Sequence, residues 1–548
     1  MVLKNNEGFV KKSNVTKFDR SVDYYVEQGA YFIKEGKYLK ALKNLFCALR
    51  KKSSDVASLI HLAIAYQKMG LIDASNSALY KILANDPKNE GAFALLGQNY
   101  SLTGDHLREL YYLKNFSEMA DDQGLMDLFA NAPNFLPRFE QVYPMTKEIR
   151  EIMIARGTKL VQAGHLDKAA ECFCEVLESF PDDAVAKNQL CVVYTLQGKN
   201  AQAIDLAKQV VIKDGKNVNG WCNLALALFN VGNVQQSDDA IHRALLVDTD
   251  KDEDIRLLVK VLCITKKYKS AAVYAQKVLE NNPYDVDYLT FAAVACFNSG
   301  EFEKAKDYFL KLNAIFPDTQ LLKYNLNLTE QILSGEKQAQ EMSFDLSLPP
   351  EEERRIIIEI ENMDYNKVWD CEEYERYISW VFSCEKVDLS EFILHKLYLT
   401  DAEKTQKILK NLLAQEYGWQ FKSMVLWKYL WHYPRKNVYA NKDGYFVPLE
   451  MPGKKLNLKD EMPFWRAFAF LSVLFVQEDD WLDKLLFSAR LVDEKLDLIL
   501  QEDFSLDEIS ALIVRSAKLQ DFDDKQICTM FRVPYNRLAK ITELVFGV

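Results

Sequence analysis

Side chains able to catalyse reactions or to hold a metal ion are spread thinly along this chain of 548 residues. Its six histidines lie far apart in the sequence, and its ten cysteines form no C-x-x-C pair. Zinc sites and thiol oxidoreductases require closely spaced cysteines or histidines, so neither chemistry is predicted. The P-loop, the H-E-x-x-H motif, the dinucleotide-binding glycine set and the G-x-S-x-G elbow are also missing from the sequence. We therefore expect a protein that is not an enzyme and uses neither a metal nor a cofactor.

One stretch near the end of the chain combines residue types that suit DNA. Residues 525–540 carry four basic side chains and no acid, although the whole chain has a net charge of −11. The stretch resembles a helix-turn-helix, whose second helix enters the major groove. The side chains that this resemblance places against DNA are Tyr535, Asn536, Arg537 and Lys540. A purely structural three-helix tail is the alternative, and the acidic charge of the chain favours it.

Most of the remaining residues belong to an internal period of 34 residues. The slot that defines it holds glycine in seven of eight units, and Lys266 fills the slot in the other one. The glycines are Gly36, Gly70, Gly104, Gly164, Gly198, Gly232 and Gly300. Seven of the eight residues that lie five positions after the slot are alanine or serine, and such small side chains let two helices cross closely. Since glycine ends a helix in the left-handed conformation, each unit is predicted to be two antiparallel helices.

The period resembles the tetratricopeptide repeat (TPR) in length and in the register of its signature residues. Those residues include Trp221, Leu224, Ala225, Gly232 and Ala244. The resemblance implies an all-α superhelical solenoid of about eight helix pairs, with a concave face that binds other proteins. Together with the helical tail, the chain resembles bacterial TPR proteins that end in a helix-turn-helix-like region.

Breaks in the period divide the chain into segments. The expected segments are a flexible N-terminal arm at 1–21, TPR repeats 1–3 at 22–123, an insertion at 124–149, TPR repeats 4–8 with a capping helix at 150–334, a linker at 335–350, a helical domain with a small β-hairpin at 351–460, and a C-terminal helical region at 461–548. The hairpin is predicted from Asp443-Gly444, a dipeptide that favours a two-residue turn. The insertion is either a cap on the first three repeats or an arm that gates the groove.

The TPR resemblance also implies which side chains line the concave groove. Those selected as the partner groove are Asn188, Val192, Asn223, Leu226, Phe229, Arg256, Lys260, Val294 and Phe297. Their mixture of apolar pockets with one positive pair suits an extended or helical segment of another protein. Asn223 is expected to bind a peptide backbone, because its amide both donates and accepts. The alternative is that Phe229 and Phe297 pack against neighbouring helices.

Composition limits the cellular setting. The chain is 49% hydrophobic, which excludes an intrinsically disordered protein. Its longest strongly apolar run, Phe464–Val476, has 13 residues, fewer than the roughly 20 that span a membrane. Scattered cysteines favour a reducing compartment. We expect a cytoplasmic scaffold or adaptor whose partner is another protein or peptide, with a DNA-binding regulator as the alternative and the oligomeric state left open.

Overall fold

The computed structural model describes residues 20–119, 147–162, 166–247, 249, 251–344, 347–433, 438–449, 451–452, 456, 458–474, 480–502, 504–519 and 522–547. Internal contacts divide the chain into two compact units. The first unit comprises residues 1–130, 407–417 and 429–548, and the second comprises 131–406 and 418–428. The expected arm at 1–21 lies outside the described residues except for its last two, and the insertion at 124–149 lies outside them except for its last three.

The first unit begins with three helix pairs. Their helices are α1 (Val22–Lys34), α2 (Tyr38–Lys51), α3 (Val56–Lys68), α4 (Ile72–Asn85), α5 (Glu90–Leu102) and α6 (His106–Met119). The first helix of each pair starts at a capping side chain, Ser21, Asp55 or Asn89, that accepts a backbone N–H from the first turn. Each first helix ends before a glycine with a positive φ, for example +78° at Gly70. These local signals recur in step with the sequence period.

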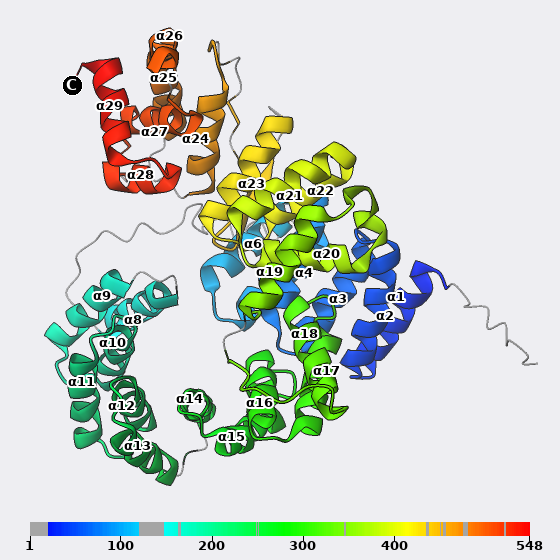
Figure 1. Ribbon diagram of the computed structural model, residues 1–548, viewed down its shortest axis with the longest axis vertical. Coiled ribbons are helices and arrows are strands. Elements are labelled where there is room, and N and C mark those ends of the chain that lie inside the picture. The colour runs from blue at the N-terminus through cyan, green and yellow to red at the C-terminus, as the bar shows by residue number, and fades with distance from the viewer. Residues whose placement is uncertain are drawn as a thin grey trace, which may run out of the picture. The chain divides into compact units, whose positions relative to one another are not determined.

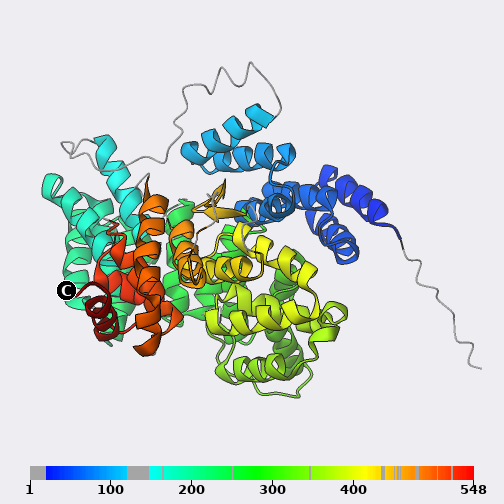
Figure 2. The same cartoon turned by 90° about the horizontal axis from the view of Figure 1, so that it is seen from above.

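A two-stranded antiparallel hairpin packs on these repeats. Strand β1 (Tyr439–Lys442) pairs with β2 (Tyr445–Pro448), and Asp443 and Gly444 form the turn with φ values of +46° and +83°. The sequence placed this hairpin in a helical domain of residues 351–460. In the structure its tip contacts the third repeat. The hydroxyl of Tyr112 on α6 donates a hydrogen bond to the carbonyl of Gly444 over 2.6 Å. Figure 2 shows the two arrows beside the helices of that repeat.

The first unit also contains a bundle of C-terminal helices (Figure 1). They are α24 (Met462–Val473), α25 (Trp481–Glu494), α26 (Leu496–Ile499), a 3-10 turn η2 (Leu500–Glu502), α27 (Leu506–Ser516), α28 (Asp524–Phe531) and α29 (Tyr535–Phe546). Helix α27 contacts α24, α25, α28 and α29, so it forms the centre of the bundle. Arg532 takes a left-handed conformation after α28, and Pro534 precedes α29. This turn separates α28 from α29.

The second unit contains five further helix pairs and a capping helix. They are α8 (Lys147–Gln162), α9 (Leu166–Ser179), α10 (Ala184–Leu196), α11 (Asn200–Lys213), α12 (Val218–Asn230), α13 (Val234–Leu246), α14 (Asp252–Ile264), α15 (Tyr268–Asn281), α16 (Val286–Asn298), α17 (Phe302–Ile315) and the capping helix α18 (Gln320–Leu333). Small residues allow the close crossings, since a Cβ on Gly157 would lie 2.6 Å from the ring of Phe173. The eight helix pairs predicted from the period are confirmed.

The second unit continues beyond the capping helix with more helices. They are α19 (Pro350–Asn362), a 3-10 helix η1 (Tyr365–Asp370), α20 (Glu372–Ser383), α21 (Val387–Thr400), the start of α22 (Ala402–Ala414) and most of α23 (Trp419–His432). Three glutamates lie in the first turn of α19, where their negative charges interact favourably with the positive end of the helix dipole. An all-α fold with a solenoid of helix pairs and a small hairpin, as predicted, is therefore confirmed.

Candidate functional site

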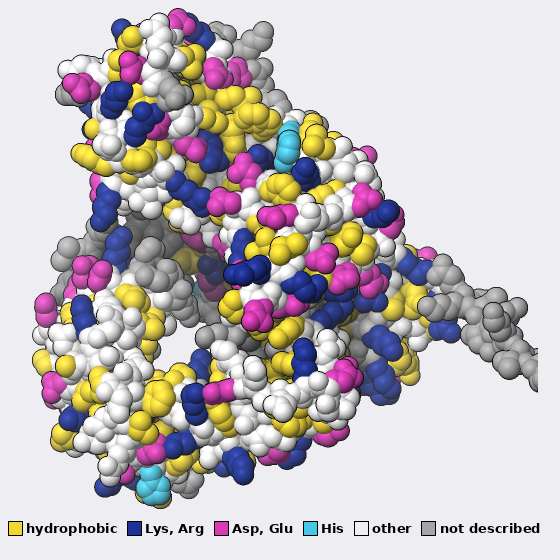
Figure 3. Space-filling model, viewed as in Figure 1, with side chains coloured by type: hydrophobic (Ala, Val, Ile, Leu, Met, Phe, Trp, Pro, Cys, Tyr) yellow, Lys and Arg dark blue, Asp and Glu magenta, His cyan; other side chains and the backbone are white. Residues whose placement is uncertain are grey.

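The first helices of repeats 5–8 form one layer of the second unit. Helix α10 contacts α12, α12 contacts α14, and α14 contacts α16. In Figure 1, α10, α12 and α14 lie along the inner side of a curved row, with α11, α13 and α15 along its outer side. Side chains that project from the inner side of this layer are the ones available to a partner. Figure 3 shows hydrophobic side chains mixed with charges of both signs on the face in view.

Four of the side chains predicted for the groove are accessible in the structure. Val192 on α10 and Leu226 and Phe229 on α12 are partly exposed, and Lys260 on α14 is exposed. We call these four residues the groove strip. It offers three apolar contacts followed by one positive charge, in the order of the repeats.

Two predicted asparagines are used within the fold. Asn188 and Asn223 are only 5% and 3% exposed. The amide of Asn223 donates to the backbone carbonyl of Asn188 over 3.2 Å and to the side-chain oxygen of Asn219 over 2.9 Å. The amide therefore joins α12 to α10. This packing corrects the expectation that Asn223 presents its amide to a peptide backbone.

Two predicted apolar residues of repeat 8 are also buried. Val294 and Phe297 are each 2% exposed, and the ring of Phe297 lies edge-on to that of Phe302 with 5.3 Å between centroids. For Phe297 the alternative of packing against neighbouring helices is the one observed, whereas Phe229 stays partly exposed. Sequence periodicity places both phenylalanines on the same kind of helix, but only the packed neighbours decide which is covered.

Arg256, predicted as one half of a positive pair, is neutralised by two aspartates. Its Nε lies 2.6 Å from Asp252, and a terminal nitrogen lies 2.5 Å from Asp285 on the next repeat. The guanidinium also stacks over the ring of Tyr288 at 4.6 Å. Burial by itself would lower the pKa of Arg256, but the two carboxylates outweigh it and raise that pKa. Arg256 thus connects α14 to α16, and Lys260 remains as the cation of the groove strip.

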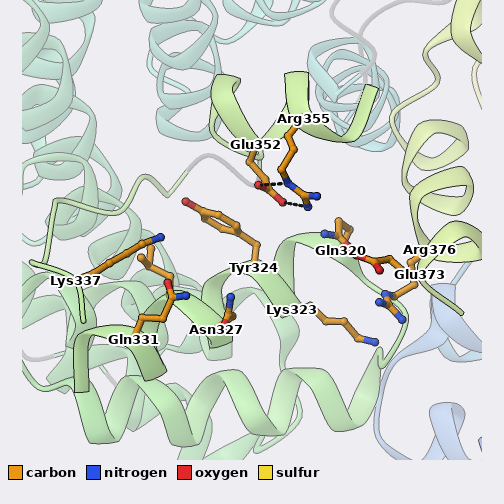
Figure 4. Close-up of a pocket in the computed structure, with 11 residues that line it drawn as sticks. Gln320, Lys323, Tyr324, Asn327, Gln331, Lys337, Glu352, Arg355, Glu373 and Arg376 are labelled. Carbon is orange, nitrogen blue, oxygen red and sulfur yellow. Dashed lines mark hydrogen bonds and ion pairs between the residues drawn. The ribbon is translucent and has the colours of Figure 1, made fainter. Parts of the chain in front are cut away.

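A polar pocket of about 410 Å³ lies where α18 meets α19 and α20 (Figure 4). In it Glu352 and Arg355 are joined by two hydrogen bonds of 3.0 and 2.7 Å, and Arg355 also donates to the hydroxyl of Tyr377 over 3.2 Å. The hydrogen bonds to Glu352 and Tyr377 raise the pKa of Arg355. Glu352, Arg355 and Tyr377 thus satisfy one another's hydrogen bonds. We assign it a structural role.

The two cations predicted to contact DNA are both paired with acids. Arg537 donates to the two oxygens of Glu508 over 2.5 and 2.8 Å, and Lys540 lies 3.0 Å from Glu502. Both also stack over the ring of Phe504. The other two predicted residues, at positions 535 and 536, are exposed on the first turn of α29. Both cations therefore have an acidic partner within the bundle, but only that of Arg537 is buried.

Among the residues that the structure describes, no group of three or more histidine, cysteine, aspartate or glutamate side chains could hold a metal ion. None of the described helices is long and apolar enough to cross a membrane.

Comparisons with known proteins agree with the repeat geometry. Residues 154–220 match the family model of the tetratricopeptide repeat. The chain is similar to the TPR repeat-containing protein MJ1428 of Methanocaldococcus jannaschii, with 24% identity over 54% of this chain and 56% of the relative. It is also similar to the peroxisomal targeting signal receptor of Kluyveromyces lactis, with 22% identity over 33% of this chain and 35% of the receptor. This chain thus spans about half of one relative and a third of the other.

Solved structures give similarities of the same kind. A thermophilic TPR protein of Thermus thermophilus is 16% identical, with a TM-score of 0.29, over 33% of this chain and 98% of that one. YrrB, described as a TPR protein with an unusual peptide-binding site, is 18% identical, with a TM-score of 0.26, over 31% of this chain and 89% of that one.

Proposed function

Because the chain carries tetratricopeptide repeats, we propose that it is a non-enzymatic adaptor that binds a peptide-like segment of another protein on the inner face of repeats 5–7. The observation that carries the proposal is the groove strip. Its residues remain accessible on consecutive inner helices, whereas the other predicted groove residues are buried or paired.

The composition of the groove strip suggests the chemistry of the partner. Leu226 and Phe229 lie one helical turn apart on α12, so they suit two apolar anchors on one segment. Lys260 on the next inner helix would pair with an acidic residue placed after those anchors. We therefore expect an extended or helical segment with spaced hydrophobic residues and one acid. A role of this kind is in keeping with the relative that is named a targeting signal receptor.

The setting that we propose for this adaptor is the cytoplasm. All ten cysteines of the chain are free thiols, and most of those in the repeats are buried. Free thiols persist in a reducing compartment, whereas an oxidising one favours disulfides.

Photo-crosslinking in the full-length chain tests the groove strip. A photoreactive phenylalanine at position 229 should crosslink a partner in native lysate, and the same residue in place of Leu246 should not. Leu246 lies on the outer helix α13 and is 68% exposed, so it is a control position more accessible than the partly exposed Phe229. The partner so identified should bind Phe229→Glu at least about thirtyfold more weakly, as expected for a central apolar anchor.

The control variant Leu246→Glu should keep wild-type affinity for the same partner. Equal crosslinking at both positions, or equal loss of binding in both variants, would place the interaction elsewhere. We do not propose DNA binding as a second function, because Arg537 and Lys540 are held by glutamates in the bundle.

A further inference from the structure

The segment after the capping helix returns along the repeats. Helix α18 ends at Leu333, Gly335 takes a φ of +80°, and the amide of Glu336 bonds the carbonyl of Gln331 over 2.9 Å. The chain then continues without helix or strand to Phe344. It passes the end of α16 and the turn between α14 and α15, where inner helices of successive repeats terminate. The sequence had suggested only a linker here.

Asn298, the last residue of α16, holds this segment by its backbone. The side-chain amide donates to the carbonyl of Met342 over 2.9 Å, and the backbone amide of Met342 donates to the side-chain oxygen over 2.8 Å. The two bonds satisfy the donor and the acceptor of one extended residue. They would form with any residue except proline at that position, because they use its backbone N–H and C=O and not its side chain.

The side chains on either side of Met342 contact particular residues of the repeats. Glu341 lies 2.8 Å from Lys266 and accepts a hydrogen bond from the hydroxyl of Tyr268. The ring of Phe344 stacks on that of Tyr268 at 5.9 Å and lies against that of Phe291 at 6.0 Å. An acid and an aromatic three residues apart are thus contacted together, with Tyr268 bonding the acid through its hydroxyl and the aromatic through its ring. We call Lys266, Tyr268, Phe291 and Asn298 the edge site.

Lys266 is the unusual member of the edge site. Lys266 occupies the glycine position of its repeat and has a φ of +62°. In the other described repeats, the left-handed residue at this position is a glycine. A side chain in this conformation is strained relative to glycine. Its ion pair with Glu341 does little to offset that strain, because both side chains are about half exposed, at 60% and 49%. What Lys266 supplies is a positive charge where an acidic ligand residue sits.

The segment lies on the surface of the repeats. Glu341 and Ser343 are exposed, and Met342 and Phe344 are only partly buried. A space of about 560 Å³ lies between residues 339–341 and the turn at Gly300. The contacts are therefore those of a bound peptide at a surface, not those of a core.

We propose that the edge site is a peptide-binding site that residues 341–344 occupy in cis. Its partner is an extended segment of another protein with a glutamate three residues before a phenylalanine. Such a segment reproduces the contacts of Glu341, Met342 and Phe344 and displaces them. The edge site shares no residue with the groove strip, so the inference goes beyond the function proposed above.

Tethering determines how the site responds to a partner. Five residues, 336–340, join the reversal at Gly335 to Glu341, so the internal segment acts at an effective concentration of about a millimolar or more. A free peptide must compete with it. Binding should therefore become stronger when the internal segment is disabled, without any change in the edge site.

The test uses the full-length chain and a fluorescent peptide with the sequence of residues 338–344, Gln-Ala-Gln-Glu-Met-Ser-Phe. Fluorescence anisotropy should show the peptide binding the double variant Glu341→Ala/Phe344→Ala at least about tenfold more tightly than the wild type. Adding Asn298→Ala to the double variant should weaken binding about tenfold, because both backbone bonds are lost. A peptide with alanine in place of its Glu and Phe should not bind.

Two controls isolate the edge site. Glu303→Ala removes an exposed glutamate on the adjacent α17 and should leave binding at the wild-type level. Phe229→Glu in the groove strip should also leave it unchanged, so that failure of the groove proposal and failure of this one are distinguishable. The proposal is overturned if the double variant binds no better than the wild type, or if Asn298→Ala has no effect.

A second measurement covers the case in which the double variant does not fold. Excess mass-tagged peptide added to the wild-type chain should speed hydrogen exchange in residues 341–344, as the internal segment is displaced. Exchange in α10 should stay constant. Unchanged exchange in the segment at saturating peptide would overturn the proposal by itself.

Discussion

Replacing Arg537 by methionine should loosen the C-terminal bundle much more than replacing Lys540 by methionine. Both residues lie on α29, and both stack over Phe504. They differ in the acid that each one contacts. The side chain of Glu508 is 7% exposed, whereas that of Glu502 is 46% exposed.

The burial of Glu508 sets the size of the effect. Without Arg537, the carboxylate keeps its bond from the backbone amide of Ser505 at 2.8 Å but loses two bonds inside the bundle. A buried polar group left unsatisfied costs about 1–3 kcal/mol, and more when it is charged. Arg537 itself is 33% exposed, so water can partly replace it, and we expect about 2 kcal/mol. The exposed pair of Lys540 is worth less than about 1 kcal/mol.

Hydrogen exchange of the α27 amides in the full-length chain is the assay, since the chain has more than one unit and a single unfolding midpoint would mix them. A loss of about 2 kcal/mol speeds exchange about thirtyfold, and a loss below about 1 kcal/mol speeds it less than about fivefold. The hydrogen bond from Arg537 lowers the pKa of Glu508. A carboxyl with a lowered pKa stabilises the fold above its unfolded pKa. That contribution is lost as the pH falls through the folded value, so the two proteins should converge in acid.

Equal effects of the two replacements would refute this reasoning, because they would show that the burial of Glu508 does not matter. So would an Arg537→Met variant that exchanges like the wild type but loses retention on DNA at low salt. That second outcome would restore the DNA-binding role that the sequence suggested for this helix.

Three further predictions concern other parts of the molecule. Tyr112→Phe removes a fully buried hydroxyl that bonds the tip of the hairpin, and exchange of the hairpin amides should rise about tenfold. Cys191 is buried, and desolvation raises the pKa of its thiol to about 12. Iodoacetamide should therefore alkylate the exposed Cys384 first and Cys191 only after unfolding, which mass spectrometry would show. Gly157→Ala would place a Cβ 2.6 Å from the ring of Phe173, and exchange in α9 should report a loss of about 1–3 kcal/mol.

The repeats could be predicted from the sequence because the forces that shape them are local. A capping side chain, a small residue at the crossing and a left-handed glycine all act within one unit of 34 residues. The turn of the hairpin is equally local in origin, since an Asp-Gly pair favours the positive φ values that Asp443 and Gly444 adopt. Local signals repeat in the sequence, so they can be read from it.

The choice of exposed groove residues could be predicted only in part. The resemblance to TPR repeats assigned Phe229 and Phe297 to the same inner face, and Asn223 beside them. Burial depends on which side chains the next repeat places against each position, and those differ from one repeat to another. Hence Phe229 is accessible while Phe297 is covered, and Asn223 is bonded to Asn188.

By itself, the sequence determined the helix pairs, their number and the turn of the hairpin. Only the tertiary structure decided that the hairpin tip meets Tyr112, 332 residues away, and that Asn298 holds Met342, 44 residues away. It also decided that Arg537 neutralises Glu508 instead of facing solvent. Such pairs join segments far apart in the chain and occur once, so no spacing in the sequence announces them.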